Sequence, residues 1–230
     1  MTTTPTRSAP RSLPQQRRNA RLILKRLTAR YPEINTALDY RDPWQLIVAT
    51  VLSAQTTDDN VNRVTPVLFE KWPYPEDLAA ANPEDIEKVV YSTGYYRQKT
   101  KSILALAADV VERFDSKVPR DLDEMITLKG VGRKTASVVL AEAWGDPAIA
   151  VDTHVKRVSN RLELTTNSDP VKIERDLKDL YLKNTWAGIS MRFIQFGREV
   201  CDARKPRCWE CPLWDRCPYE PKTARPRTDR

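Results

Sequence analysis

The sequence predicts an all-α protein. Apolar residues recur at three-and-four spacing along several segments, which is the period of an amphipathic helix. Three pairs place a capping side chain directly before a proline at the first helical position: Asp42-Pro43, Asn82-Pro83 and Asp169-Pro170. Alternating strand patterns are scarce, and the best short apolar candidate, residues 148–151, is too brief to imply a sheet.

Four segments show the helical period most clearly, and each marks one amphipathic helix. The first, near the N-terminus, contains Leu22, Leu24 and Leu27. The apolar positions of the other three are, in chain order, Ile103, Leu104, Ala107, Val110, Val111 and Phe114; Val151, Val155, Val158 and Leu162; and Ile173, Leu177, Leu180 and Tyr181.

The composition is ordinary for a soluble globular protein. Of 230 residues, 40% are hydrophobic and 30% charged, so the chain can bury a core in one large domain or two small ones. No run of 18 apolar residues exists, and the N-terminus lacks the apolar core of a secretory signal. We therefore expect no membrane partner and a cytoplasmic location.

Positive charge is concentrated at the N-terminus. Residues 1–35 hold eight Lys and Arg and one acid, Glu33, whereas the remaining residues balance. A basic arm favours a polyanion such as nucleic acid, and a solvated tail explains it equally well. Residues 1–17 are expected to be a disordered basic tail, because the segment is rich in Thr, Pro and Arg and contains no acid. A transit peptide has a similar composition, but the prolines oppose the amphipathic helix that it needs. Residues 219–230 are expected to fray.

All four cysteines lie close together, as Cys201, Cys208, Cys211 and Cys217. Disulfides would need an oxidising compartment. A structural zinc site usually pairs two close knuckles, whereas this spacing has one Cys-x2-Cys and two distant outer ligands. A [4Fe–4S] cluster accepts such unequal loops. The ligand type alone leaves zinc and iron–sulfur equally supported.

The first cysteine loop, DARKPR, carries Arg204, Lys205 and Arg207. Metal thiolates at both ends would hold these cations in place, which suits phosphate binding because less side-chain entropy is lost on contact. The alternative is that the metal only staples a short segment that lacks its own core.

A cramped glycine turn, Gly130-Val131-Gly132, opens an apolar-periodic run in LKGVGRKTASVVL. Such a turn before a helix directs free N–H groups outward, where the helix dipole also favours an anion. An ordinary glycine-capped helical turn is the alternative. Helix, GVG and helix in succession favour a helix–hairpin–helix that binds the DNA backbone.

Lys134 and Asp152 are the candidate catalytic residues. The dipole at a helix N-terminus and the adjacent Arg133 disfavour a proton on the Lys134 amine, which would make it a nucleophile; a solvated surface lysine is the alternative. Asp152 is expected to be an N-cap, and a carboxylate fixed in that way suits the stabilisation of a cationic sugar. His154, the only histidine, is assigned to structure.

Four motifs in order, LSAQTTD at residues 52–58, LKGVGRKTA, VDTH and CDARKPRCWECPLWDRC, resemble endonuclease III, a bifunctional DNA glycosylase of the helix–hairpin–helix superfamily. The resemblance covers roughly residues 18–220. It implies two helical domains flanking a DNA cleft: a six-helix domain over 36–135, and a discontinuous domain of 18–35 plus 136–218. It also implies a [4Fe–4S] cluster on the four cysteines.

The resemblance implies the chemistry as well. Lys134 matches the lysine that attacks C1′, expels an oxidised pyrimidine and forms the Schiff base from which β-elimination cuts the strand. Asp152 matches the catalytic aspartate. Gln55 matches the residue that fills the space left by the base, and Asp58 matches a neighbouring position. The implied partner is double-stranded DNA with oxidised pyrimidines or abasic sites, bound by a monomer at the bacterial nucleoid.

Two residues depart from the family pattern. Tyr95, in STGYYRQKTKSI, occupies the position of an apolar wedge that parts the opposite strand, and a tyrosine still stacks on bases. Lys129 replaces a common proline and adds a cation beside the phosphate turn. Three roles stay open for Arg133: contact with a phosphate, an effect on the Lys134 amine, or packing elsewhere.

Two other functions were weighed. An adenine glycosylase of the same superfamily typically lacks a lysine at position 134 and has a further C-terminal domain. A non-catalytic DNA-binding scaffold would not need both Lys134 and Asp152. The presence of both residues favours the bifunctional enzyme.

Overall fold

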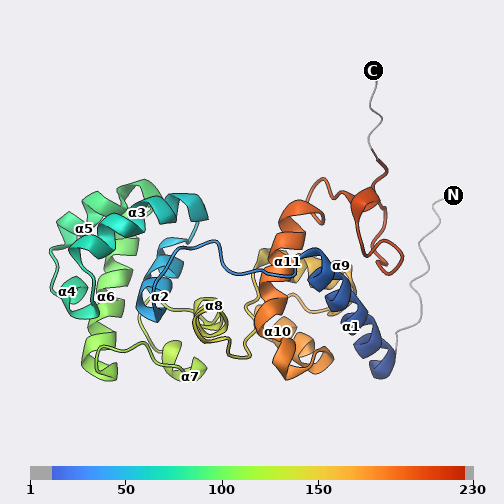
Figure 1. Cartoon of the computed structure of the whole chain (residues 1–230), viewed down its shortest axis with the longest axis horizontal. Helices are drawn as coiled ribbons and strands as arrows, with labels where there is room; N and C mark the ends of the chain where they lie inside the picture. The colour runs from blue at the N-terminus through green and yellow to red at the C-terminus, as the bar shows by residue number, and fades with distance from the viewer. Residues whose placement is uncertain (1–11, 226–230) are drawn as a thin grey trace, which may run out of the picture. The chain divides into compact units, whose positions relative to one another are not determined.

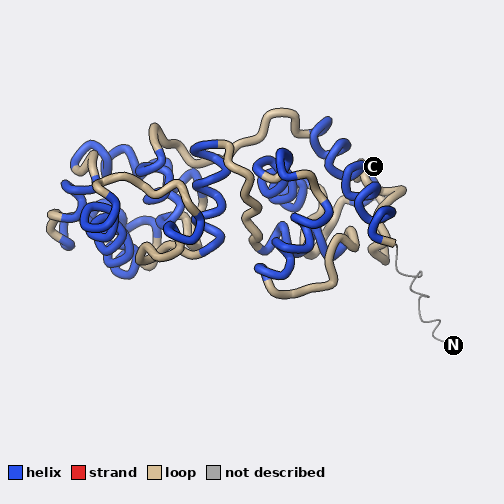
Figure 2. The backbone as a smooth tube through the Cα atoms, turned by 90° about the horizontal axis from the view of Figure 1, so that it is seen from below, coloured by secondary structure: helices blue, strands red, loops and turns tan. Residues whose placement is uncertain are grey.

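A computed structural model of the chain describes residues 12–225, which consist of helices and loops (Figures 1 and 2). No strand lies within this range, so the all-α prediction is confirmed. The helices are α1 (Leu13–Arg30), α2 (Pro43–Leu52), α3 (Asp58–Lys71), α4 (Pro75–Ala79), α5 (Pro83–Val90), η1 (Tyr91–Thr93), α6 (Tyr96–Phe114), α7 (Leu122–Met125), α8 (Arg133–Trp144), α9 (Thr153–Arg161), α10 (Pro170–Leu180), η2 (Lys183–Thr185), α11 (Ala187–Glu199) and η3 (Cys208–Glu210).

The three predicted proline-adjacent caps are confirmed. The side chain of Asp42 accepts from Gln45 N at 2.8 Å, and that of Asp169 accepts from Lys172 N at 2.9 Å. The Asn82 side chain accepts from Glu84 N at 2.9 Å. Each cap satisfies a helix N–H that has no partner within the helix, an interaction that typically stabilises by about 1 kcal/mol.

The described chain divides into two compact units. Unit 1 contains residues 12–33, 151–185 and 192–225, and unit 2 contains residues 34–150 and 186–191. Six α-helices, α2 to α7, lie within 36–135. The contacts differ from the expected division at residues 136–150, which group with unit 2. The reason is that the apolar face of α8, with Ala136 and Val139, shares one hydrophobic core with α2 and α6.

The core of unit 2 surrounds α2. Eight of the ten residues of α2 are buried, so most of the surface of this helix is covered by its neighbours. Ile103, Leu106 and Val110 of α6 pack into the same cluster. This core carries the glycine turn at one end of α8.

The core of unit 1 is built from α1, α9, α10 and α11. Its fully buried side chains include Ile23 and Leu27 of α1, Ile173 of α10, and Phe193 and Phe196 of α11. Tyr181 and Phe193 meet edge to face, with ring centroids 6.5 Å apart. The Arg192 Nε donates to the carbonyl of Tyr31 at 3.1 Å and ties α11 to the end of α1.

Residues 13–17 and 219–225, which were expected to lie in the two tails, belong to the folded structure. The α1 helix begins at Leu13, so residues 13–17 are helical rather than disordered, and the Ser12 N–H donates to Gln15 Oε1 at 3.0 Å. Residues 1–11 lie outside the described residues. At the other end, Thr223 accepts from Cys208 N at 3.2 Å, so residues 219–225 fold back instead of fraying. Residues 226–230 lie outside the described range.

Among residues 12–225, no helix is both long enough and apolar enough to cross a membrane.

Candidate functional site

The glycine turn connects α7 to α8 in unit 2. Gly130 has φ +80°, a left-handed conformation that L side chains rarely adopt, and a Cβ there would lie 3.0 Å from Ser102 Cβ of α6. Val131 is buried and anchors the turn in the core. Gly132 is the N-cap of α8 and supplies no side-chain cap. Unlike α2, α9 and α10, α8 therefore begins without a hydrogen bond from the side chain of its N-cap residue.

Lys134 lies in the first turn of α8 and is exposed. No residue of the described chain forms an ion pair with its ammonium group. The amine is thus accessible beside the glycine turn. Its neighbour Arg133 is half-buried and has interactions within the protein.

Lys129 is held by a buried carboxylate rather than left free. Its backbone N–H donates to Asp109 Oδ2 at 2.8 Å, and its Nζ lies 3.3 Å from Asp109 Oδ1. Asp109 is 5% exposed and also lies 3.8 Å from Arg113. Part of the Lys129 charge is therefore balanced within the protein, which the local sequence does not reveal.

Asp152 belongs to unit 1 and is the N-cap of α9. Its Oδ1 accepts from Val155 N at 2.8 Å, so the predicted cap is confirmed. That bond fixes a half-buried carboxylate, while no hydrogen bond to Oδ2 is found within residues 12–225. His154 is half-buried beside Arg157, with its Nδ1 3.1 Å from Arg157 Nη2, and burial lowers the pKa of this imidazole.

Gln55 and Tyr95 occupy two loops of unit 2 and share an unusual backbone. Both have left-handed conformations, with φ of 56° and 49°, and both side chains are exposed. Such conformations are uncommon for residues other than glycine and tend to occur at functional sites. No local pattern in the sequence predicts these two conformations.

Asn60 links these two loops and was missed by the sequence analysis. Its Nδ2 donates to Thr56 Oγ1 at 3.1 Å and to the carbonyl of Ser92 at 2.8 Å. Because Thr56 and Ser92 adjoin the loops of Gln55 and Tyr95, one side chain fixes both. An asparagine two residues into a helix gives no such signal in the sequence.

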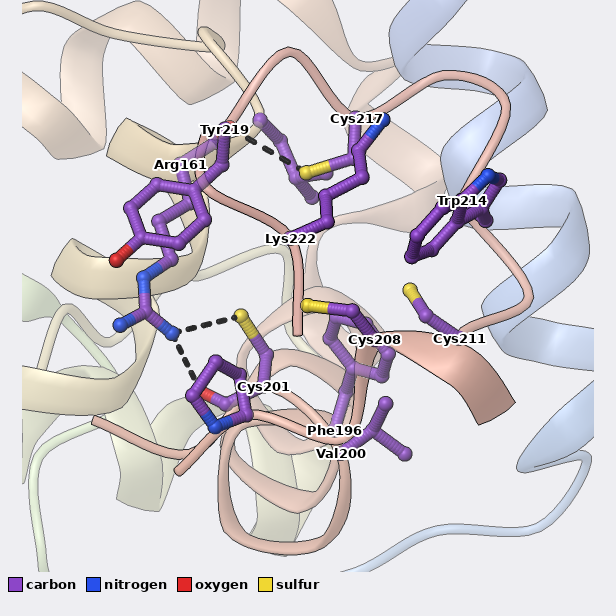
Figure 3. Close-up of a pocket in the computed structure, with 12 residues that line it drawn as sticks. Arg161, Phe196, Val200, Cys201, Cys208, Cys211, Trp214, Cys217, Tyr219 and Lys222 are labelled. Atoms are coloured by element: carbon purple, nitrogen blue, oxygen red, sulfur yellow. Dashed lines mark hydrogen bonds between the residues drawn. The ribbon is translucent and has the colours of Figure 1, made fainter. Parts of the chain in front are cut away.

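The four cysteines meet around one cavity in unit 1. Cys201, Cys208, Cys211 and Cys217 line it, and their sulfur atoms point into the same space (Figure 3). All four are free thiols, so no disulfide joins them. The sequence spacing therefore brings the four predicted ligands together.

The surroundings of the thiols suit metal-bound thiolates. The Arg161 Nη1 lies 3.4 Å from Cys201 Sγ (Figure 3). The Leu213 N–H donates to Cys211 Sγ at 3.4 Å. Burial raises the pKa of the Cys211 thiol to about 11 and also raises that of Cys217. A bound metal offsets this burial, because it favours the deprotonated ligand.

The cations of the first cysteine loop divide into two kinds. Asp202 Oδ1 accepts from the N–H groups of Arg204 and Lys205, both at 2.8 Å, and their side chains are exposed. Arg207 instead donates from Nε to the carbonyl of Glu199 at 2.7 Å. Arg204 and Lys205 are thus presented outward, whereas Arg207 braces the loop.

Two family models match the chain. Residues 48–183 match the HhH-GPD superfamily base excision DNA repair protein, and residues 201–217 match the iron-sulfur binding domain of endonuclease III. The second match distinguishes iron–sulfur from zinc for the four cysteines and supports a [4Fe–4S] cofactor.

Proteins named endonuclease III are similar to this chain over most of its length and most of their own. Endonuclease III of Synechocystis is 50% identical over 86% of this chain and 89% of its own. Endonuclease III of Bacillus subtilis is 46% identical over 81% and 86%, respectively. A solved structure of a trapped endonuclease III–DNA covalent intermediate, an estranged-adenine complex, has a TM-score of 0.84 at 42% identity and covers 88% of this chain and 95% of that one. The chain therefore belongs to the endonuclease III family of helix–hairpin–helix base-excision DNA repair proteins.

Proposed function

We propose that Lys134 and Asp152 carry out the chemistry of this base-excision repair enzyme, a bifunctional DNA glycosylase and abasic-site lyase for oxidised pyrimidines. The observation that carries the assignment is the exposed Lys134 amine in the first turn of α8, directly after the Gly130–Gly132 turn. The amides of that turn bind a phosphate, which brings the sugar of the same strand to the amine.

Lys134 acts as the nucleophile. Its neutral amine attacks C1′ of the deoxyribose, and the bond from C1′ to the damaged base breaks with its electrons leaving on the base. The nitrogen bonded to C1′ then loses a proton, and the departing base takes one up. Opening of the sugar ring then gives an iminium ion between Lys134 and C1′. The iminium acidifies the C2′ proton, and its loss expels the 3′ phosphate and breaks the strand. Water finally hydrolyses the imine and restores the lysine.

Asp152 stabilises the positive charge that the sugar develops as the base departs. Its Oδ1 is held by Val155 N, so the carboxylate requires little reorganisation, while Oδ2 remains available to the sugar or to a proton. The cap and the catalytic group are therefore the same side chain.

The exposed loops of unit 2 act on the duplex itself. Moving a base out of the stack costs a few kcal/mol of stacking and pairing free energy, and this cost is least for a damaged pair. Gln55 fills the vacated space, and Tyr95 enters from its left-handed turn and stacks against the opposite strand.

The cysteine loop supplies a second set of contacts. Cys201, Cys208, Cys211 and Cys217 hold the [4Fe–4S] cluster, which when bound staples this segment of the chain. Arg204 and Lys205 contact DNA phosphates. Lys129, Arg133 and Arg207, which also interact with neighbouring groups of the protein, add positive charge that attracts the same DNA.

We also propose that the protein acts as a monomer on chromosomal DNA in the bacterial cytoplasm. The bacterial relatives support this assignment, and the two neighbouring endonuclease III–DNA structures support DNA as the partner.

Borohydride trapping on abasic duplex DNA tests the proposal. The protein should form a covalent adduct, because borohydride reduces the Schiff base, and Lys134→Gln should form none. Lys172→Gln, an exposed lysine of α10, is the matched control and should give the normal adduct. No adduct from the unaltered protein, or a normal adduct from Lys134→Gln, would contradict the assignment.

A further inference from the structure

A buried lysine lies directly behind the turn that carries Tyr95. Lys99, in the first turns of α6, is only 4% exposed. Its Nζ donates to the carbonyl of Thr93 at 2.6 Å, and no carboxylate within the described chain forms an ion pair with it. Burial lowers the pKa of this amine. An ammonium with one carbonyl partner is an expensive group to place in a core.

Lys99 forms hydrogen bonds at both ends of the turn. Its backbone N–H donates to the carbonyl of Tyr95 at 3.0 Å, while its Nζ holds the carbonyl of Thr93. Between these two carbonyls lie Gly94, with φ 70°, and Tyr95, with φ 49°. A positive φ is readily adopted by glycine but is strained for Tyr95, so Tyr95 keeps this conformation only where surrounding contacts hold it.

The position of the amine explains how its burial is tolerated. Thr93 ends η1, which continues directly from α5, so its carbonyl lies at the negative end of a helical segment. Thr93 is itself 1% exposed and donates its hydroxyl to the carbonyl of Val90 at 2.7 Å. The ammonium therefore caps the C-terminal end of η1 and holds the following turn against it.

We propose that Lys99 is a positioning residue that holds the Gly94–Tyr95 turn in the conformation from which Tyr95 enters the DNA duplex. The inference rests on the proposed role of Tyr95 as the wedge. It assigns to Lys99 no contact with DNA, because the side chain is buried within unit 2. Its contribution is to keep an exposed, strained aromatic residue ready before DNA arrives, which lowers the ordering cost of binding.

The test uses Lys99→Met with Lys101→Met as its matched control. Both variants lose one positive charge from the same helix, but Lys101 is exposed. The probe is a duplex with 2-aminopurine opposite a tetrahydrofuran abasic analogue, because 2-aminopurine brightens when it leaves the stack. Tyr95→Ala sets the emission expected without a wedge.

We expect Lys99→Met to lose the emission gain down to the Tyr95→Ala level and to bind this duplex about tenfold more weakly, the equivalent of one hydrogen bond to a charged group. Lys101→Met should keep the gain. The salt dependence of binding should be unchanged in Lys99→Met, because a lysine that contacts phosphate would reduce the slope by about one. The melting temperature should change little, because removal of a costly buried charge offsets the loss of the hydrogen bond to the Thr93 carbonyl.

A normal emission gain in Lys99→Met overturns the inference, and so does a reduced salt slope. A lower melting temperature together with a lost gain also overturns it, in favour of a purely structural role. If Lys99→Met does not fold, Lys99→Arg should keep the gain and Lys99→Gln should lose it; the reverse overturns the inference. Borohydride trapping of the unaltered protein judges the Lys134 chemistry separately, so the two failures are distinguishable.

Discussion

Replacement of Gly130 by alanine tests whether the phosphate turn depends on its backbone conformation. Gly130 has φ +80°, and an alanine forced into the left-handed region costs roughly 1–2 kcal/mol. The new Cβ would also lie 3.0 Å from Ser102 Cβ, and overpacking of this kind adds roughly 1–3 kcal/mol. Gly130→Ala should therefore lower the free energy of unfolding by about 2–5 kcal/mol, the sum of the two contributions.

Two other glycines separate these contributions. Gly145 has φ +68° but nothing within 4 Å of its Cβ position, so Gly145→Ala should show the backbone strain alone, about 1–2 kcal/mol. Gly132 has neither a positive φ nor a close neighbour, so Gly132→Ala should lose only about 1 kcal/mol, from a poorer N-cap residue.

Urea unfolding followed by helical circular dichroism, at equal cluster content, measures all three variants. A double-mutant cycle with Ser102→Gly then isolates the crowding, because removal of the Ser102 Cβ should recover roughly 1 kcal/mol or more of the Gly130→Ala loss. If Gly130→Ala is no worse than Gly145→Ala, or if Ser102→Gly recovers nothing, the argument for a close approach to α6 is refuted.

Three further predictions follow from single contacts. Asp152→Asn should keep the stability of α9, because asparagine caps a helix as well as aspartate does, yet it should lower the rate of single-turnover base excision by about 100-fold or more. Asp169→Asn, at the N-cap of α10, is the control. An equal loss of rate in both variants would contradict the catalytic role. Thr223→Ala removes the acceptor for Cys208 N, so the iron–sulfur absorbance at roughly 400 nm should bleach faster under a chelator; an unchanged rate would mean that residues 219–225 do not protect the cluster. Burial lowers the pKa of His154 in the folded protein, so the folded state favours the neutral imidazole. The stability that depends on this neutral form is complete above the unfolded pKa of about 6.5 and is lost as the pH falls below it. His154→Gln should therefore flatten the decline in the free energy of unfolding, measured with urea from pH 7 to 5.

The features that the sequence predicted well depend on neighbours close in the chain. A cap joins residues two or three positions apart, so Asp42, Asn82, Asp169 and Asp152 were recognisable from their local context. The cysteine spacing likewise constrained the ligand set, although zinc and iron–sulfur were separated only by the family resemblance and then by the match to an iron–sulfur domain.

Other assignments failed or stayed incomplete because they depend on distant partners. Lys129 pairs with Asp109, twenty positions earlier, so its charge is less free than its local sequence implies. Residues 219–225 were expected to fray, but the Thr223 contact to Cys208 depends on how the cysteine loop closes. The boundary at residue 136 moved because α8 packs with α2, a choice that helical periodicity does not encode.

The sequence by itself determined the helical class, the helix starts, the glycine turn with its following lysine, and the four thiols, since each is a short-range pattern of side chains and backbone freedom. Only the tertiary structure decided that Gln55 and Tyr95 adopt left-handed turns, that Asn60 ties their loops together, and that Lys99 is buried behind one of them. The Asn60–Ser92 contact joins positions 32 residues apart, and the burial of Lys99 depends on the core that packs around it. In both cases the free energy of the whole core outweighs the local preference of each residue.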